Sequence, residues 1–549
     1  MSISRTTAAS MKSETGGRKL PPVSAILLLA LMGLPILWLA LAALDTTGAG
    51  GLAAAMLPTA LRETATLMAW VGLITGVLGL LSAWLVTHFD FPGRRIFEWA
   101  LVLPLAIPTY LAAYTYVEFL DFTGPIQQAL RAVIGGETIK DYWFPQIKSP
   151  SGAAFVLSMV LYPYVYASCR AFFVMQSGSI SAAARTLGAG GFRAFFSVTL
   201  PLSRPALVVG ITLAMMEVVN DLGAVQYFGV NSLTAVIYST WINRSNFGGA
   251  AQLAVMIVLI IGLLILLEQW ARRDRVYALH RDSRVAPPRE QLVGAERALA
   301  IGFCTVLLLL GFGVPVGELL VLAIRNLGPD AFGLTVNAGL TTVTLASLGA
   351  LMTVIVGLAA AHIGKSRAAH GLIRIATLGY AIPGTVLALG LLQPLGQADL
   401  WFNRMTMAVA NWRPGLILSG SIAALLYVYA IRFLAVSHST IDAAMKKRGD
   451  TMLDAGRVLG VTGWRLLFRV DLPTLSPALL TAATLVFVEI VKELPATLLL
   501  RPLGVETLAT VVYARANVSL FTESALPALT IVLVGLVPVI LSTRFSDRR

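Results

Sequence analysis

The chain has 549 residues, of which 57% are hydrophobic and only 13% are charged. Average proteins carry about 25% charged residues, so this composition excludes a water-soluble enzyme, a disordered scaffold and a fibrous protein. The net charge of +13 comes from Lys and Arg residues placed between apolar runs rather than from one basic stripe, which argues against nucleic acid as a partner. The two cysteines, Cys169 and Cys304, lie far apart inside apolar segments, and we expect them to be buried thiols rather than a disulfide or metal ligands.

Twelve apolar segments are long enough to cross a bilayer, whose core of ~30 Å needs about 20 residues of helix. They fall near residues 22–44, 62–88, 96–118, 153–175, 204–228, 250–270, 298–324, 338–363, 372–396, 414–434, 476–500 and 525–543. The first run of about 23 apolar residues exceeds the usual length of a cleavable signal peptide, so we expect it to be a retained helix. The sequence therefore predicts an all-α integral membrane protein with 12 transmembrane helices, with the lipid bilayer as its surroundings.

The placement of the basic residues predicts the orientation of these helices. With the N-terminus in the cytoplasm, 28 of the 41 Lys and Arg residues lie on the cytoplasmic side, 10 lie outside, and three lie within or at the edge of spans. This bias satisfies the positive-inside rule. We therefore expect both termini to be cytoplasmic, as short tails over residues 1–21 and 544–549.

The chain is predicted to consist of two related halves. Motifs recur at a spacing that shortens slightly along the chain: Thr64 matches Thr342, Ile107-Pro108 matches Ile382-Pro383, and Leu200-Pro201 matches Leu472-Pro473. Such a repeat indicates duplication with small deletions and two pseudo-symmetric halves around a shared pathway. The expected halves are residues 22–270, with spans 1 to 6, and 298–543, with spans 7 to 12, joined by a basic cytoplasmic linker over residues 271–297.

One loop pattern occurs in both halves, between spans 4 and 5 and between spans 10 and 11. The first copy reads AAARTLG from residue 182, followed after nine residues by VTLP, and the second reads DAGRVLG from residue 454, followed after nine residues by VDLP. Small residues permit close packing of a short helix against another protein, and the glycine ends that helix. The Leu-Pro pair restarts a helix, because proline is tolerated in a first turn.

This pattern resembles the E-A-A, three residues, G, nine residues, I-x-L-P signature of the permease subunits of ATP-binding-cassette importers. The resemblance implies a type I importer permease fold in which each loop docks on an ATPase subunit. It places that coupling role on Ala183, Ala184, Gly188 and Pro201, and on Asp454, Ala455, Gly460 and Pro473. The family's glutamate is replaced by Ala182 in the first copy, and its second alanine by Gly456 in the second copy, which is expected to weaken that short helix.

Shorter runs resemble the fused ferric-iron permeases of this class, in which one chain supplies both halves. They are FPGR from residue 91, LPLAIP from residue 103, EVVNDLG from residue 217 and KELPATL from residue 492. The resemblance implies a bacterial inner-membrane permease that receives ferric iron from a solute-binding protein and works with two copies of an ATPase subunit. Thiamine, polyamine, phosphonate and sulfate permeases of the same class remain alternatives.

Spans 5 and 11 each carry an acidic pair at i and i+4, Glu217 with Asp221 and Glu489 with Glu493. This spacing predicts that each pair shares one helix face, near a helix break on the outer side. Carboxylates inside a bilayer are costly and usually face the protein interior. They either line the pathway as transient ligands for a hard cation or brace a gate by bonding to Lys492, Asn220, Arg170 or Arg432. Both interpretations stay open because Lys492 stands three residues from Glu489.

Other membrane-embedded polar side chains are expected to have ordinary roles. Arg170 and Arg432, which each follow a Tyr-Val-Tyr-Ala run, are predicted to reach the cytoplasmic headgroups. Tyr110, Tyr114 and Tyr116 are either phenol-oxygen donors to the pathway or members of an interfacial aromatic belt, and the belt is favoured because it explains most membrane tyrosines.

No catalytic or nucleotide-binding motif is present, so we expect a transport subunit that binds no cofactor or firm metal itself, while a partner subunit uses ATP and magnesium. A proton-coupled secondary transporter is a rival interpretation for two six-helix halves, but it does not account for the paired loops.

Overall fold

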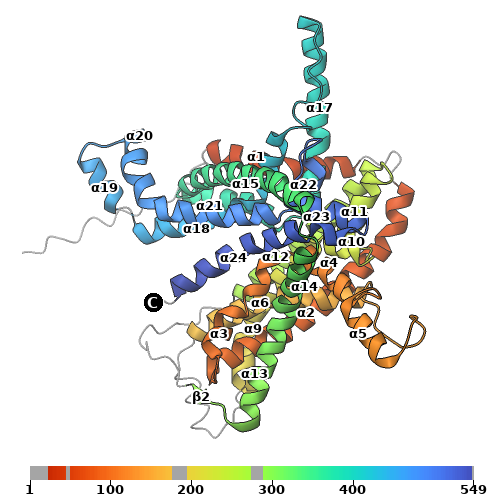
Figure 1. The fold of residues 1–549 in the computed structure, drawn as a ribbon. Coiled ribbons are helices and arrows are strands. Elements are labelled where there is room, and N and C mark those ends of the chain that lie inside the picture. The colour runs from red at the N-terminus through yellow and green to blue at the C-terminus, as the bar shows by residue number, and fades with distance from the viewer. Residues whose placement is uncertain (1–22, 45–49, 176–194, 274–288, 450, 547–549) are drawn as a thin grey trace, which may run out of the picture.

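A computed structural model describes residues 23–44, 50–175, 195–273, 289–449 and 451–546, which are almost entirely helical (Figure 1). In this part of the chain, ten helices are long and apolar enough to cross a membrane. Two further pairs of helices are bent by 93° and 107°, and they bring the number to 12 if each pair is one span. The expected all-helical fold with 12 membrane spans is confirmed.

The N-terminal half contains spans 1 to 6, of which span 3 is the first bent pair and span 5 is followed by two short helices. Its helices are α1 (Val23–Ala43), α2 (Gly50–His88), α3 (Arg94–Ala100), η1 (Leu103–Ala106), α4 (Thr109–Leu120), α5 (Pro125–Ile134), α6 (Pro150–Met175), η2 (Phe195–Thr199), α9 (Leu200–Asn220), α10 (Gly223–Tyr227), α11 (Leu233–Ile242) and α12 (Phe247–Arg273).

The C-terminal half repeats this order, and the described residues include the segment that the sequence predicts to be its coupling loop. Its helices are α13 (Gly294–Leu308), η3 (Leu309–Gly313), α14 (Val314–Arg325), α15 (Pro329–Ile363), α16 (Arg367–Ala376), η4 (Thr377–Ala381), α17 (Gly384–Ala410), α18 (Ile422–Arg448), α19 (Thr451–Val458), α20 (Gly463–Leu466), η5 (Leu467–Asp471), α21 (Leu472–Lys492), α22 (Pro495–Leu500), α23 (Leu508–Asn517), η6 (Phe521–Ser524) and α24 (Ala525–Ser546).

The linker between the halves lies only partly within the described residues. Its last part forms the two-residue strand β2 (Glu290–Gln291), which pairs in parallel with β1 (Phe89–Asp90) after span 2. The Leu292 backbone N–H also donates to the Asp90 carbonyl at 3.1 Å. The end of the linker is therefore attached to the loop between spans 2 and 3.

The first span of each half packs against the opposite half. α1 contacts α15, α16 and α17, and the Trp38 indole N–H donates a 3.0 Å hydrogen bond to Gln393 Oε1. Reciprocally, η3 and α14 contact η1, α4 and α6, and the Tyr116 hydroxyl donates to the Leu310 carbonyl. Spans 1 and 7 therefore hold the two halves together, each by packing against the opposite half.

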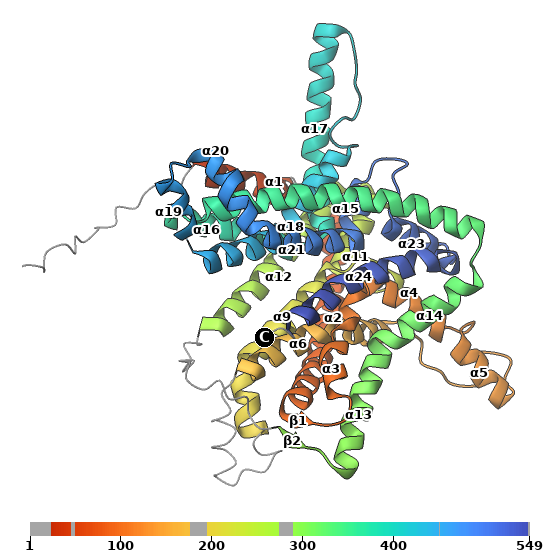
Figure 2. The ribbon, with the colours of Figure 1, turned by 60° about the vertical axis from the view of Figure 1, so that its left-hand side comes forward.

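The helices of the two halves converge at one end of the molecule and diverge at the other. In Figure 1, α2, α9 and α13 run toward the bottom, whereas α15, α18 and α21 run toward the left, and the second view agrees (Figure 2). The short helices α10, α22 and α23 lie near the convergence, while α19 and α20 lie at the divergent end. The far part of α17 projects well beyond the other helices.

In each half, a glycine lets span 2 approach span 4 closely. A Cβ atom at Gly79 of α2 would lie 2.5 Å from Val165 Cβ of α6, and one at Gly357 of α15 would lie 2.8 Å from Ser437 Cβ of α18. Small residues commonly permit such contacts between membrane helices. Gly79 matches Gly357 in the register of Thr64 and Thr342, and Val165 matches Ser437 in the register of the two Leu-Pro pairs. The repeat is therefore structural as well as sequential.

We predict that Gly79→Ala and Gly357→Ala each destabilise the protein by ~1–3 kcal/mol, because the added methyl group overpacks the crossing. The measurement is the midpoint of thermal unfolding in detergent. Gly262→Ala in α12 and Gly339→Ala in α15 are matched controls, since no heavy atom lies within 4 Å of the added Cβ and alanine favours helix. Unfolding of the Gly79→Ala and Gly357→Ala variants at the midpoint of these controls would contradict the packing argument.

Candidate functional site

The site lies where the fifth span of each half breaks. α9 ends at Asn220 and α10 begins at Gly223, whereas α21 ends at Lys492 and α22 begins at Pro495. Both interruptions follow from the sequence, because glycine and proline interrupt helices and fall at the same positions of the repeat. The helix break expected near the acidic pairs is therefore present in both halves.

One acid at each break holds the next short helix in place. Asp221 Oδ1 accepts hydrogen bonds from the backbone N–H groups of Ala224 at 2.8 Å and Val225 at 3.3 Å. In the other half, Glu493 Oε1 accepts from the Ala496 N–H at 3.0 Å. These carboxylates satisfy N–H groups that have no partner within the helix. The placement of these two acids differs from the expected one. Asp221 and Glu493 follow the C-terminal ends of α9 and α21, so they do not share a helix face with Glu217 and Glu489.

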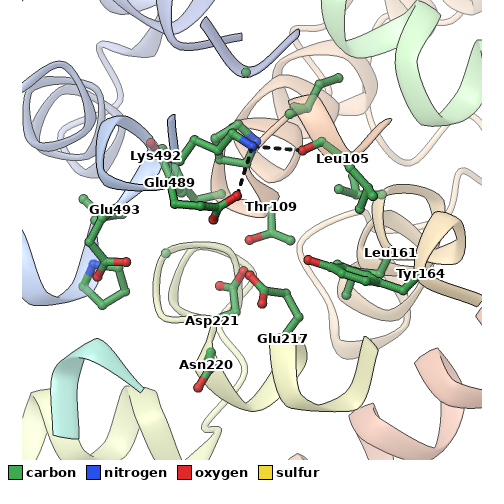
Figure 3. A pocket seen from close by; sticks show the side chains of 18 of the residues that line it. Leu105, Thr109, Leu161, Tyr164, Glu217, Asn220, Asp221, Glu489, Lys492 and Glu493 are labelled. Carbon is green, nitrogen blue, oxygen red and sulfur yellow. Dashed lines mark hydrogen bonds and ion pairs between the residues drawn. The ribbon is translucent and has the colours of Figure 1, made fainter. Parts of the chain in front are cut away.

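The remaining two acids, Glu217 of α9 and Glu489 of α21, line a cavity of about 440 Å³ between the halves. Asp221 and Glu493 also line it, so all four predicted pathway acids come together there. The Glu217 carboxylate lies beside that of Asp221 and near the Tyr164 ring (Figure 3). Thr109 and Asn220 complete this oxygen-rich wall on the N-terminal side.

The two halves differ in the cations that accompany these acids. Lys492 Nζ lies 3.9 Å from Glu489 Oε1 and donates to the Leu105 carbonyl at 3.2 Å (Figure 3). At the equivalent position of the repeat, the N-terminal half has the neutral Asn220. The expected pairing of Lys492 with Glu489 is thus found, and it belongs to one half alone.

A second cation enters the cavity from α18. Arg432 Nε lies 3.0 Å from Glu493 Oε2, with side chains that are 11% and 4% exposed, and Arg432 also donates to the Ile382 carbonyl at 3.4 Å. Arg432 therefore does not extend to the headgroups, and its bond to Glu493 is one of the contacts expected if the acids brace a gate. The sequence misled because the two Tyr-Val-Tyr-Ala runs are not equivalent: Tyr164 lies past the middle of α6, whereas Tyr427 lies in the second turn of α18. Arg170 instead pairs with Glu98 of α3.

The tyrosines of α4 are buried, contrary to the predicted interfacial belt. Tyr110 lines the cavity, Tyr114 packs against the rings of Tyr227 and Phe521 at centroid distances of 4.5 and 5.5 Å, and Tyr116 reaches η3. Two cavity residues, Tyr164 and Tyr380, were not singled out in the sequence. Tyr380 could have been found from the sequence, because it lies two residues before the repeated Ile-Pro pair.

The coupling-loop residues are described mainly in the C-terminal half. Ala183, Ala184 and Gly188 lie outside the described residues, and Pro201 occupies the first turn of α9. In the second copy, α19 carries Asp454 and Ala455, Gly460 has the left-handed φ of 78°, and Pro473 occupies the first turn of α21. Asp454 is exposed and pairs with Arg457 at 2.9 Å.

Gly456 also has a packing role that the sequence did not suggest. It is buried, and a Cβ atom there would lie 2.8 Å from Leu466 Cδ1 and 3.4 Å from Val470 Cγ2. The missing side chain therefore lets α19 lie directly against α20 and η5, which makes the loop a compact unit.

Two repeated halves around a charged cavity, each with a broken fifth span, define a membrane transport permease. The family model of the binding-protein-dependent transport system inner membrane component matches residues 75–274 and again residues 353–549. The chain therefore belongs to this family and contains its permease domain twice, which confirms the fused, type I ATP-binding-cassette permease fold and a multi-pass inner-membrane protein.

Similarity to curated proteins extends over nearly the whole chain. The chain is 25% identical over 542 residues to the Fe(3+)-transport system permease protein FbpB 2 of Haemophilus influenzae, and the match covers 96% of this chain and 99% of that protein. It is also 28% identical over 203 residues to the molybdenum transport system permease protein ModB of Escherichia coli K12, covering 36% and 84% of the two chains. The sulfate transport system permease protein CysT of the same organism is 27% identical over 199 residues, covering 35% and 68%.

We predict that Arg432→Gln destabilises the protein by ~3–5 kcal/mol, because it leaves the Glu493 carboxylate buried without its partner. The double variant Arg432→Gln with Glu493→Gln should regain part of that loss, since no uncompensated charge remains. Thermal unfolding in detergent measures both effects. Arg170→Gln is the comparison, because its ion pair with Glu98 is partly exposed, with side chains 26% and 30% accessible. An equal or smaller loss for Arg432→Gln than for Arg170→Gln would contradict the proposed burial effect.

Proposed function

We propose that this permease imports ferric iron from a solute-binding protein into the cytoplasm, driven by two copies of a separate ATPase subunit that uses ATP and magnesium. The main observation that supports ferric iron as the substrate is the acidic cavity between the two broken spans. Four carboxylates and two cationic side chains, those of Arg432 and Lys492, line it, which leaves a formal charge of −2. The similarity over 96% of the chain to an Fe(3+)-transport permease supports the same cargo.

The chemistry of the cavity favours a hard cation over an oxyanion. Carboxylate, hydroxyl, amide and carbonyl oxygens are the ligands that hard cations prefer. A molybdate or sulfate ion would meet Glu217 and Asp221 on the N-terminal wall, and burying like charges together without compensation is costly. Sulfate is therefore not the favoured cargo, although permeases for oxyanions are among the relatives.

In this proposal two of the four acids brace the helix breaks and the other two line the pathway, so both interpretations left open by the sequence apply. Asp221 and Glu493 fix the breaks, while Glu217 and Glu489 present their carboxylates to the passing cation. Among the described residues, no three His, Cys, Asp or Glu side chains are grouped so that they could hold a metal ion. In this proposal the cargo is a transient occupant, attracted by charge and passed on as the halves move.

The coupling loops are proposed to contact the ATPase subunits at the cytoplasmic face, with both chain termini on that side. Asp454, Ala455, Gly460 and Pro473 shape the C-terminal contact, and Ala183, Ala184, Gly188 and Pro201 shape the N-terminal one. Because one chain supplies both halves, one permease serves two ATPase copies. Closure of the ATPases on ATP would bring the loops together and turn α9 and α21 so that the cavity opens outward.

We predict that Glu217→Gln together with Glu489→Gln lowers iron uptake roughly tenfold, equivalent to ~1.4 kcal/mol, because the cavity then attracts a cation less strongly. Uptake is measured in proteoliposomes that contain the permease, its ATPase and iron-loaded binding protein. Glu506→Gln is the control, since that exposed acid lies outside the cavity and pairs with Arg501. Normal uptake by the double variant, with ATPase stimulation intact, would contradict the pathway role.

A further inference from the structure

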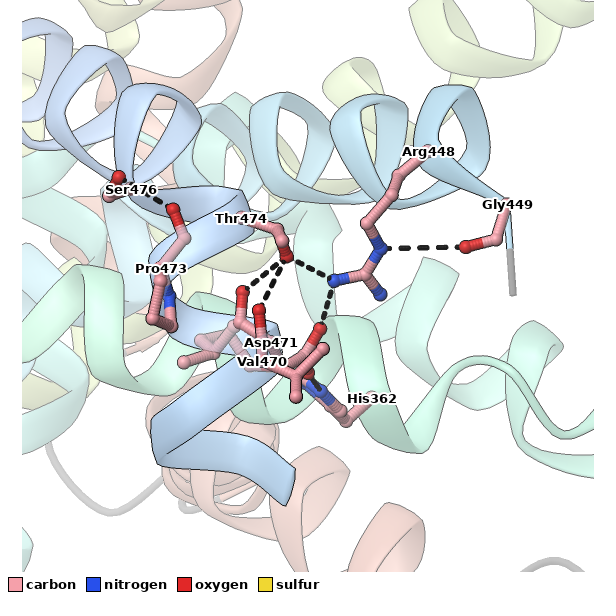
Figure 4. A network of polar contacts seen from close by, with 9 residues as sticks. His362, Arg448, Gly449, Val470, Asp471, Pro473, Thr474 and Ser476 are labelled. Carbon is pink, nitrogen blue, oxygen red and sulfur yellow. Dashed lines mark hydrogen bonds and ion pairs between the residues drawn. The ribbon is translucent and has the colours of Figure 1, made fainter. Parts of the chain in front are cut away.

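A buried ion pair closes the base of the C-terminal coupling loop. Arg448 is the last residue of α18, and Asp471 is the last residue of η5, directly before α21 begins. Every residue of α19 and α20 therefore lies between these two side chains in the sequence. Arg448 Nη1 bonds Asp471 Oδ1, and the two side chains are only 9% and 5% exposed (Figure 4).

The same carboxylate also binds a third span. His362, near the end of α15, has its Nε2 atom 2.5 Å from Asp471 Oδ2, and its Nδ1 atom 2.8 Å from the Leu358 carbonyl. The contact with Asp471 is a hydrogen bond when Nε2 carries a proton, because a carboxylate oxygen is only an acceptor. Asp471 thus uses both carboxylate oxygens to join the ends of α15 and α18 to the start of α21.

A hydroxyl group adds a fourth contact at this point. Arg448 Nη1 donates to Thr474 Oγ1 at 2.8 Å, and that hydroxyl donates in turn to the Val470 and Asp471 carbonyls, also at 2.8 Å (Figure 4). The Arg448 Nε atom donates to the Gly449 carbonyl at 3.4 Å, next to the left-handed turn at which α18 ends. We call Arg448, Asp471, His362 and Thr474 the neck cluster.

The N-terminal half has different residues at the equivalent positions. In the register of the two Leu-Pro pairs, Asp471 corresponds to Thr199 and Arg448 to Gln176, and in the register of span 2, His362 corresponds to Trp84. Trp84 packs against Phe89 and Phe195 at centroid distances of 4.9 and 4.6 Å. The neck cluster is therefore specific to the C-terminal half and does not follow from the duplicated fold.

We propose that the neck cluster makes α19, α20 and the three spans α15, α18 and α21 move as one unit when the ATPase displaces the loop. Separating Arg448 from Asp471 would leave the Arg448 guanidinium without a carboxylate partner and would remove one of the two side chains that bind Asp471 in a poorly solvated site, so the neck cluster resists opening. α21 then carries the movement from Asp471 to Glu489, about 27 Å along a helix rising 1.5 Å per residue. Arg448, Asp471 and His362 are in this sense positioning residues, and the inference rests on the coupling role proposed above.

The test measures how far a movement of the loop reaches the cavity. Cys169 and Cys304 are replaced by serine, and a reporter cysteine is placed at Leu485, which lines the cavity on α21. The complex with the ATPase is held in nanodiscs and labelled with a membrane-impermeant maleimide, with and without a non-hydrolysable ATP analogue. ATPase binding and ATP hydrolysis are measured on the same samples.

We expect the nucleotide to change the labelling rate in the parent complex, and Asp471→Asn to reduce that change roughly tenfold, within the usual range of coupling between sites. Bound ATPase and the labelling rate without nucleotide should stay at parent values. His362→Gln should act in the same direction. Asp442→Asn is the matched control, because it removes an ion pair with Lys446 that lies within α18 and joins no second helix.

Parent-like nucleotide response in Asp471→Asn would overturn the proposal. If that variant does not assemble with the ATPase, Arg448→Lys and Arg448→Gln decide: retained response in the lysine variant and loss in the glutamine variant support the neck cluster, whereas equal response in both overturns it. Failure of all three variants to assemble would assign the cluster to folding and also overturn the proposal. If the parent chain itself does not bind the ATPase, the proposed function fails, and this inference fails with it.

Discussion

The structure depends on satisfying the backbone where helices break inside a membrane. Lipid offers no hydrogen bonds, so an interrupted helix must find partners within the protein. Asp221 and Glu493 provide them by accepting bonds from the first N–H groups of α10 and α22. Once these caps are in place, the chain can turn at the cavity, and Glu217 and Glu489 are held at its wall.

The duplicated scaffold carries an unequal distribution of charge. Arg432 and Lys492 accompany the acids of the C-terminal half, whereas Val160 and Asn220 stand at the matching positions of the other half. The two acids of the N-terminal half, Glu217 and Asp221, therefore have no Lys or Arg at the positions that match Lys492 and Arg432. The neck cluster belongs to the C-terminal half as well, so in the proposed mechanism this half supplies the rigid link to the ATPase.

Much of this organisation could be predicted from the sequence, because apolar length and repeated Gly, Pro and Leu-Pro positions are local signals. They predicted the 12 spans, the two halves and the breaks beside the acids. The packing of α1 against the opposite half and the ion pair of Arg432 with Glu493 depend on contacts between distant segments, which no local sequence pattern encodes. The two Tyr-Val-Tyr-Ala runs show the difficulty, because identical residues lie at different positions along α6 and α18. The placement of Asp221 depends on the end of α9 at Asn220, which the sequence did not locate.

In the proposed mechanism, ATP drives a hard cation through an acidic cavity between the two halves. The most direct measurement is the uptake of radiolabelled iron, sulfate and molybdate, compared in proteoliposomes that hold the permease, its ATPase and its binding protein. We expect ATP-dependent accumulation of iron and no accumulation of either oxyanion. Accumulation of sulfate or molybdate without iron would contradict this mechanism.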